Sequence, residues 1–277
     1  MISELFKNWK SNKISADELV ISIEKLIDNK SINEINDEEL HNYLDLSSKP
    51  DFLMKLSDND LLNRWAETTY TIIRKSNYTL LDMFTQRVKE TPEKIYFQDL
   101  STPKVQNWTY KRIGILAKEI ASAFYIIGKN EPRVAIFSEN SVPSAVCDLA
   151  CLFYDIPDTP LNVTFSSDIL IEIFDLLSIN IVVTDTIERF GKLDSIRDKV
   201  KNPFTIIVTN SNVYHDNQTS FYLDEEIKKY DNESLNNALF NRKRLKLNET
   251  ATVMFTSGST GIPKGLSFSI YNLVTKR

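Results

Sequence analysis

The sequence is short of the residues that build most metal and redox sites. Its 277 residues include only two cysteines and two histidines. Cys147 and Cys151 are four residues apart and would share one face of a helix. Two interpretations are open: a metal or redox pair, or two small buried side chains. The second is favoured because neither histidine is nearby in the sequence, so we expect no metal ligand in this chain.

Long apolar runs and an excess of basic residues are also missing. The N-terminal segment MISELFKNWKSNK has no apolar core of a signal peptide, and no apolar run reaches the roughly 18 residues that span a bilayer. The formal net charge of −5, without a basic face, argues against nucleic acid as a partner. We expect a cytoplasmic chain without a transmembrane segment.

Glycine is scarce, and its distribution is uneven. Three of the six glycines fall within MFTSGSTGIPKGLSFS, residues 254–269, directly after an apolar strand expected at 251–255. Glycine lets backbone N–H groups converge on one anion, hydroxyls add neutral donors, and a lysine adds a point charge. The combination predicts a site for the phosphates of a nucleoside triphosphate, formed by Thr256, Ser257, Gly258, Ser259, Thr260, Gly261, Lys264 and Gly265.

Other glycine motifs fit this loop less well. A Walker A loop requires glycine directly before its lysine and Ser/Thr directly after it, whereas Lys264 is followed by Gly265. A dinucleotide fingerprint requires G-x-G-x-x-G, and the first glycine is missing here. A flexible, hydroxyl-rich turn is the remaining alternative.

Residues 1–77 are expected to form a helical appendage. Ile2, Leu5, Phe6 and Trp9 recur at helical spacing, and Ser15 with Glu18 forms a capping-box pattern. The first apolar stripe suits either a membrane surface or packing within the protein, and packing is favoured.

From residue 78 the pattern predicts alternating helices and strands. Helices are expected at 80–90, 111–128, 143–155, 166–178 and 187–200, and strands at 94–99, 106–110, 133–139, 179–185 and 203–210. This alternation favours an α/β fold with a doubly wound, mostly parallel sheet. Residues 210–248 are expected to be a surface excursion with one short helix, and the basic run 242–244 is either an anion site or a solvated charge cluster.

At this point the sequence resembles a known family. TSGSTGIPKG, with Phe255 before it, is similar to the phosphate-binding loop of the adenylate-forming (AMP-binding) superfamily. That superfamily contains acyl-CoA synthetases, adenylation domains of nonribosomal peptide synthetases, and luciferases. WTYKRI at 108–113 and RVAIFSENSVPSAVCDLACLFYDIPDTPLN at 133–162 also resemble family segments. The resemblance covers residues 78–277 and is of the acyl-CoA synthetase type.

The resemblance implies a two-step reaction. A carboxylic acid, expected to be a fatty acid, attacks the α-phosphate of Mg-ATP to give an acyl-adenylate, and the acyl group then passes to coenzyme A. ATP, Mg²⁺ and CoA are therefore the expected cofactors and co-substrates. A carrier-protein acceptor, and a non-catalytic interaction module, are the alternatives.

The sequence also departs from the family. Members carry glycine where this chain has Asp155, and a Ser/Thr-His pair where it has Ser269 and Ile270. The family's adenine-binding segment, Mg²⁺-binding Glu and C-terminal catalytic Lys are expected beyond residue 277. The chain is therefore expected to be the N-terminal portion of the AMP-binding domain and to be inactive alone. A C-terminal half on a separate chain is one candidate partner.

Overall fold

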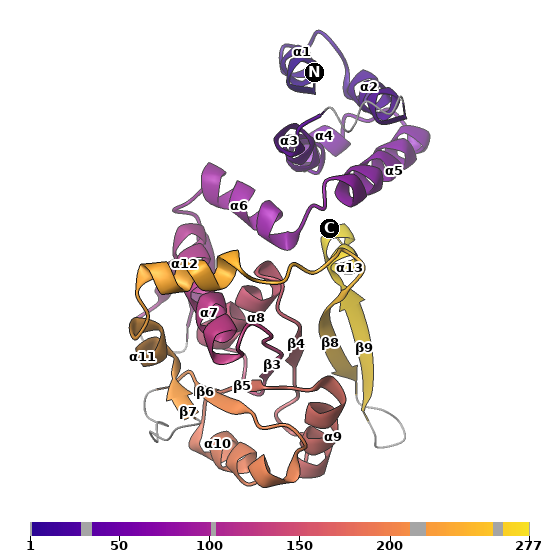
Figure 1. Ribbon diagram of the computed structural model, residues 1–277. Coiled ribbons are helices and arrows are strands. Elements are labelled where there is room, and N and C mark those ends of the chain that lie inside the picture. The colour runs from indigo at the N-terminus through magenta and orange to yellow at the C-terminus, as the bar shows by residue number, and fades with distance from the viewer. Residues whose placement is uncertain (1, 29–34, 101–103, 211–219, 257–262, 277) are drawn as a thin grey trace. The chain divides into compact units, whose positions relative to one another are not determined.

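The computed structural model describes residues 2–28, 35–100, 104–210, 220–256 and 263–276 (Figure 1). The chain divides into two compact units, one formed by residues 1–86 with 274–277 and one by residues 87–273. The expected domain boundary at residue 78 stays a prediction, because compactness alone does not show which segment folds independently.

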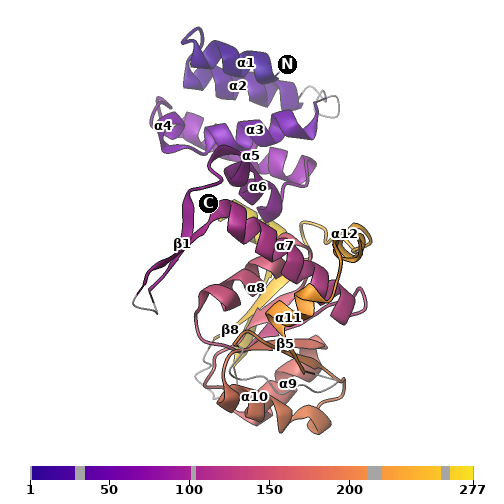
Figure 2. The same ribbon diagram turned by 90° about the vertical axis from the view of Figure 1, so that its left-hand side faces the viewer.

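The first unit is a group of helices with its own buried core (Figure 2). Ile2 is fully buried, Phe6 stacks on Tyr43, and Trp9 packs against Phe52. The predicted apolar stripe therefore packs within the protein rather than facing a membrane. The helices are α1 (Ile2–Lys10), α2 (Ala16–Asp28), α3 (Asp37–Ser47), α4 (Pro50–Leu53) and α5 (Asn59–Lys75).

Local side-chain caps fix the starts of two helices. Ser15 N–H donates to Glu18 Oε2 at 2.7 Å, and Glu18 N–H donates to Ser15 Oγ at 3.1 Å, which confirms the predicted capping box before α2. Thr79 N–H donates to Asp82 Oδ2 at 2.8 Å, and Asp82 N–H donates back to Thr79 Oγ1 at 3.3 Å. This second pair caps α6 (Leu80–Glu90) where the sequence predicts a helix start.

The second unit is built on a mostly parallel sheet. In the part of the chain that the structure describes, its seven strands lie in the order β7-β6-β5-β3-β4-β8-β9, and only β9 runs antiparallel to its neighbour. A separate antiparallel pair joins β1 (Ile95–Asp99) to β2 (Gln106–Thr109). The strands of the large sheet are β3 (Val134–Ile136), β4 (Asp158–Pro160), β5 (Ile181–Thr184), β6 (Thr205–Val208), β7 (Ser220–Tyr222), β8 (Thr250–Thr256) and β9 (Lys264–Ser269).

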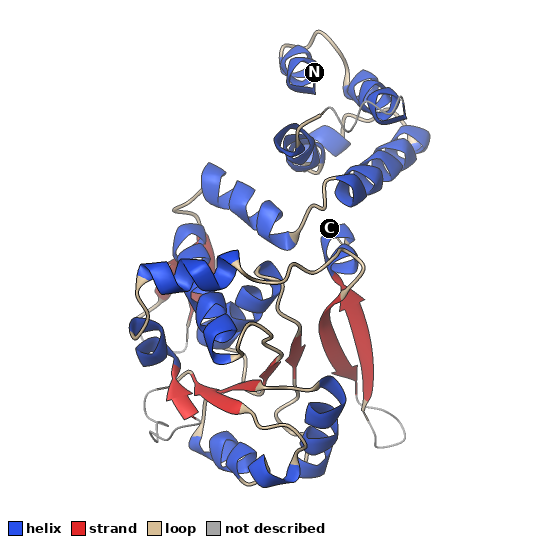
Figure 3. Ribbon diagram, viewed as in Figure 1, coloured by secondary structure: helices blue, strands red, loops and turns tan. Residues whose placement is uncertain are grey.

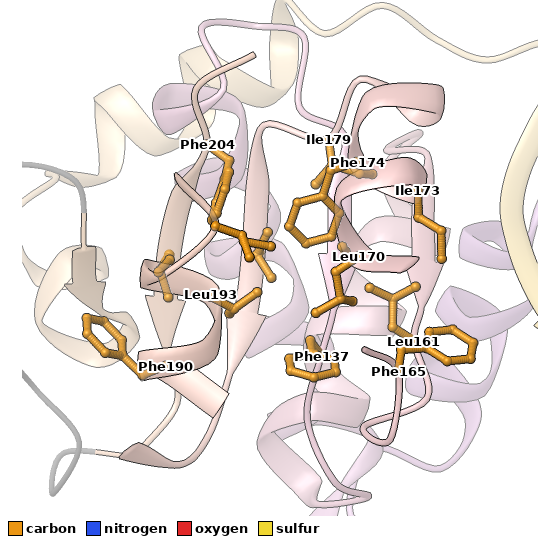
Figure 4. Packing of buried hydrophobic residues seen from close by; sticks show 14 of the residues in the cluster. Phe137, Leu161, Phe165, Leu170, Ile173, Phe174, Ile179, Phe190, Leu193 and Phe204 are labelled. Atoms are coloured by element: carbon orange, nitrogen blue, oxygen red, sulfur yellow. The ribbon is translucent and has the colours of Figure 1, made fainter. Parts of the chain in front are cut away.

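Helices cover both faces of this sheet, which confirms the doubly wound α/β prediction (Figure 3). One face packs against α8 (Val142–Phe153), which itself packs on α7 (Tyr110–Ile127). The other face packs against α9 (Ser167–Leu177) and α10 (Ile187–Asp194), whose side chains form the cluster in Figure 4. There the rings of Phe174 and Phe204 meet edge to face at 5.2 Å between centroids. The remaining helical elements are a 3₁₀ turn (Arg197–Lys199), α11 (Leu223–Lys228), α12 (Asn232–Phe240) and α13 (Ile270–Thr275).

The expectation for residues 210–248 is wrong in part. Within its described residues, this segment supplies β7, which extends the sheet by pairing parallel with β6, and two helices rather than one. Both α11 and α12 contact α7. The polar composition of this segment does not predict these elements, because their stability comes from tertiary contacts rather than from local propensity.

Asp155 and Arg242 form a largely buried ion pair. Asp155 has φ of 65°, the left-handed conformation for which glycine is the usual choice. Its carboxylate accepts from Arg242 Nε at 3.0 Å and from the N–H of Leu245 at 3.3 Å. The two side chains are 9% and 10% exposed. Arg242 is thus a structural partner, and only Lys243 and Arg244 of the basic run face solvent.

We expect Asp155→Asn to lower the free energy of unfolding by about 3 kcal/mol, since removing one member of a buried pair isolates the other charge. Asparagine tolerates a positive φ, so the effect reports the lost charge rather than backbone strain. Urea denaturation followed by circular dichroism measures it. The matched control is the exposed Asp198→Asn, expected to change stability by less than about 0.5 kcal/mol. Equal effects of the two substitutions would contradict a stabilising Asp155–Arg242 pair.

Among the described residues, no helix is both long enough and apolar enough to span a bilayer.

Candidate functional site

The glycine-rich loop is held between two paired strands. β8 leads into it at Thr256, and β9 leaves it at Lys264 (Figure 1). Thr256 and Lys264 are directly paired across the ladder, and Thr256 Oγ1 donates to the Lys264 carbonyl at 3.4 Å. The loop therefore starts and ends at neighbouring points of one hairpin.

Five of the eight predicted site residues lie outside the described residues: Ser257, Gly258, Ser259, Thr260 and Gly261. The other three lie together on the hairpin. Thr256 and Lys264 are exposed at the ends of their strands, and Gly265 follows on β9. Because the two strand ends are paired, the Thr256 hydroxyl and the Lys264 ammonium start from adjacent backbone positions at the base of the loop.

Gly265 is required by close packing within the hairpin. It lies opposite Phe255. A Cβ atom at this position would be 3.1 Å from Cε1 of Phe255 and 3.2 Å from Cγ1 of Val253. Phe255 in turn packs against the hydrophobic cluster beneath the sheet. The glycine thus lets the strand after the loop lie close to the strand before it.

We expect Gly265→Val to lower the free energy of unfolding by about 1–3 kcal/mol, because overpacking forces neighbouring side chains out of place. The control is Ser267→Val, which places the same side chain at an exposed position of β9. Thermal denaturation compares the two. Unchanged stability in Gly265→Val would show that Phe255 moves aside without cost.

Charged groups link the ends of β3 and β5, the two strands between which the strand order of the sheet reverses. The chain proceeds from β3 to β4 on one side and returns to β5 on the other, and ligands of such sheets bind beyond the strand ends at this reversal. Here Arg189 Nε donates to Asp185 Oδ1 at 2.6 Å, and Glu139 N–H donates to Asp185 Oδ2 at 3.2 Å. The space between the ends of β3 and β5 is therefore occupied by protein groups.

An open cavity of about 310 Å³ lies on the other side of β3, beside β4 and β8. Its polar wall contains hydroxyls, an amide and one carboxyl group. Two of the hydroxyls are used locally, since Ser141 and Ser144 form the capping box of α8. The polar lining residues are Ser138, Asn140, Ser141, Ser144, Asp148 and Thr252.

Behind this wall lies a buried acid that the sequence analysis missed. Asp158 is 1% exposed in the middle of the sheet and is paired with Thr252 of β8. Burial, followed by the adjacent Asp148, raises the pKa of Asp158 well above the usual carboxyl range. Asp148 and Thr252 face its carboxyl group, yet no contact to it has ordinary hydrogen-bond geometry. In the sequence, the only indication of this buried acid is the aspartate of IPDTPLN, a segment that otherwise contains no charged residue.

The two cysteines are buried side chains. Cys147 and Cys151 are free thiols of α8 with no exposed surface, and burial raises the pKa of both. Within the described ranges, no group of three or more His, Cys, Asp or Glu side chains is placed to hold a metal ion.

Comparison with known proteins gives a consistent picture. A family model described as AMP-binding enzyme matches residues 84–277. The probable acyl-activating enzyme 16, chloroplastic, of Arabidopsis thaliana is 23% identical over 205 residues, which are 70% of this chain and 28% of that protein. Long-chain-fatty-acid–CoA ligase 5 of Rattus norvegicus is 25% identical over 175 residues, 60% of this chain and 26% of the ligase.

Among solved structures, a red-emitting luciferase from Phrixothrix hirtus superposes with a TM-score of 0.56 at 21% identity. The superposition covers 70% of this chain and 46% of the luciferase, and at this identity it shows a shared fold. The chain thus spans about a quarter of the length of these two curated relatives.

Proposed function

The chain belongs to the AMP-binding enzyme family, and on that premise we propose that it takes part in activating a carboxylic acid with ATP. The acid becomes an acyl-adenylate and is then transferred to coenzyme A. This proposal rests on the pairing of the two strand ends from which the loop starts and to which it returns: Thr256 lies directly opposite Lys264. A fatty acid is the proposed acid, because one relative is named a long-chain-fatty-acid–CoA ligase. A cytoplasmic location is part of the same proposal.

The roles of the loop residues follow from their chemistry. The hydroxyls and backbone N–H groups of residues 256–261 bind the β- and γ-phosphates of ATP, and Lys264 neutralises the departing pyrophosphate. Gly265 keeps β9 close enough to β8 to hold Lys264 at the base of the loop. Mg²⁺ accompanies ATP, and it is assigned to no residue of this chain, because no suitable group of ligands lies among the described residues.

We further propose that these 277 residues bind phosphate groups without completing the reaction. The support is their coverage of about a quarter of two full-length relatives, together with Ile270. Where the resemblance leads one to expect a histidine, Ile270 is 4% exposed and starts α13. The partner expected for catalysis is the remaining part of the enzyme, either in the same polypeptide or as a separate chain.

We expect Lys264→Ala to weaken binding of ATP to the 277-residue chain by about tenfold or more, since charge-assisted contacts contribute roughly 1.5–3 kcal/mol. Isothermal titration calorimetry with Mg-ATP measures this. Lys243→Ala removes another exposed lysine and should leave affinity unchanged. Equal affinity of the Lys264→Ala variant and the unchanged protein would remove Lys264 from the phosphate site.

We expect the isolated chain to show no ATP–pyrophosphate exchange with fatty acids of any length. We place the metal-binding carboxylate in the remaining part of the enzyme, and without it the transition-state charge is incompletely stabilised. Radiolabelled pyrophosphate exchange is the measurement, with a complete acyl-CoA synthetase as the positive control. Acid-dependent exchange above background would contradict the proposed incompleteness while leaving the phosphate site intact.

A further inference from the structure

The cavity beside β8 combines an apolar wall with an acidic floor. Apolar side chains from the sheet, α8 and α13 supply most of its surface: Ile136, Ala145, Leu152, Pro160, Leu161, Met254 and Leu273. At about 310 Å³, it falls at the lower end of the range of small-molecule sites. Such sites place a few polar groups in a mostly apolar surface, and those groups determine which ligand binds.

Two carboxyl groups lie at this cavity. Asp148 lines it, and Asp158 lies behind the lining and is 1% exposed. Within the described part of the chain, the cavity lining contains no Lys, Arg or His side chain. Burial raises the pKa of Asp158 and so favours its neutral form, which leaves Asp148 as the carboxyl group that a positively charged occupant would face.

Thr252 provides an independent indication of a ligand. This side chain is 1% exposed and lines the cavity, and its Oγ1 has no hydrogen-bond partner in the described residues. Both carboxyl oxygens of Asp158 likewise have no hydrogen-bond partner of ordinary geometry among the described residues. Asp158 lies behind the lining and faces Thr252 and Asp148, whereas Thr252 itself lines the cavity. Buried polar atoms are nearly always paired, so the Thr252 hydroxyl indicates that a ligand forms a hydrogen bond there.

We propose that this cavity binds a small organic ammonium ligand, with its charged head against Asp148 and Thr252 and its apolar body against Leu152, Leu161 and Met254. An ammonium group has up to three N–H donors and no acceptor, which complements a floor of acceptors.

A metal ion fits the same observations less well. A hard divalent cation takes six or more oxygen ligands and retains several waters. In this cavity the hydroxyls of Ser141 and Ser144 are already engaged in the cap of α8, and apolar side chains dominate the remaining wall. An ammonium head with a hydrocarbon body uses both parts of the surface.

The test is a calorimetric titration of the 277-residue chain at neutral pH with three probes: n-hexylammonium chloride, 1-hexanol and MgCl₂. Hexanol has the same hydrocarbon body without the charge. We expect hexylammonium to bind at least tenfold more tightly than hexanol. Asp148→Asn should remove this preference, and the exposed Asp198→Asn should retain it. Thr252→Val serves as the second variant should Asp148→Asn fold poorly, and it should weaken hexylammonium binding in the same direction, because the ammonium head loses a hydrogen-bond acceptor.

Three outcomes would overturn the proposal: equal binding of hexanol and hexylammonium, unchanged hexylammonium affinity in both Asp148→Asn and Thr252→Val, or binding of Mg²⁺ but not of hexylammonium. None of them involves ATP. The ammonium site therefore stands or falls separately from the phosphate site, which the Mg-ATP titration tests.

Discussion

The pairing of β8 with its two neighbouring strands determines where the candidate site lies. On one side β8 pairs parallel with β4, through Asp158 and Thr252, and on the other it pairs antiparallel with β9. The parallel pairing brings the end of β8 to the same edge of the sheet as the ends of β3 and β4, where ligands of α/β sheets bind. The antiparallel pairing returns the chain at Lys264. Together the two ladders fix both ends of residues 257–263, whatever conformation the loop itself adopts.

The Asp155–Arg242 pair shows how a departure from a family pattern can be structural. A glycine in this turn would satisfy the positive φ but leave Arg242 without its buried acceptor. With Asp155, the turn after α8 is tied to the segment between α12 and β8. The basic run at 242–244 therefore contributes less free positive charge than its sequence indicates. This weakens its interpretation as an anion site.

Features set by local interactions were predictable from the sequence, and those set by distant pairing were not. Thr79 caps α6 through contacts with Asp82, three residues away, so the helix start is visible in the sequence. β4 contains Asp and Pro on either side of Thr, and Asp and Pro are depleted in strands, so it becomes a strand because β3 and β8 lie beside it. The strand that leads into the loop, β8, was predictable from its apolar residues. The cluster of Asp148, Asp158 and Thr252 was not, since it depends on the register between β4 and β8.

Charge is distributed unevenly between the two candidate sites. Lys264 stands exposed at the base of the loop, whereas Asp148 and Asp158 lie at the floor of the adjacent cavity. Because like charges repel each other strongly in a partly desolvated space, Asp148 disfavours an anionic group in the cavity. The exposed ammonium of Lys264 favours one at the base of the loop. The two proposed sites therefore differ in the sign of the charge that each accepts.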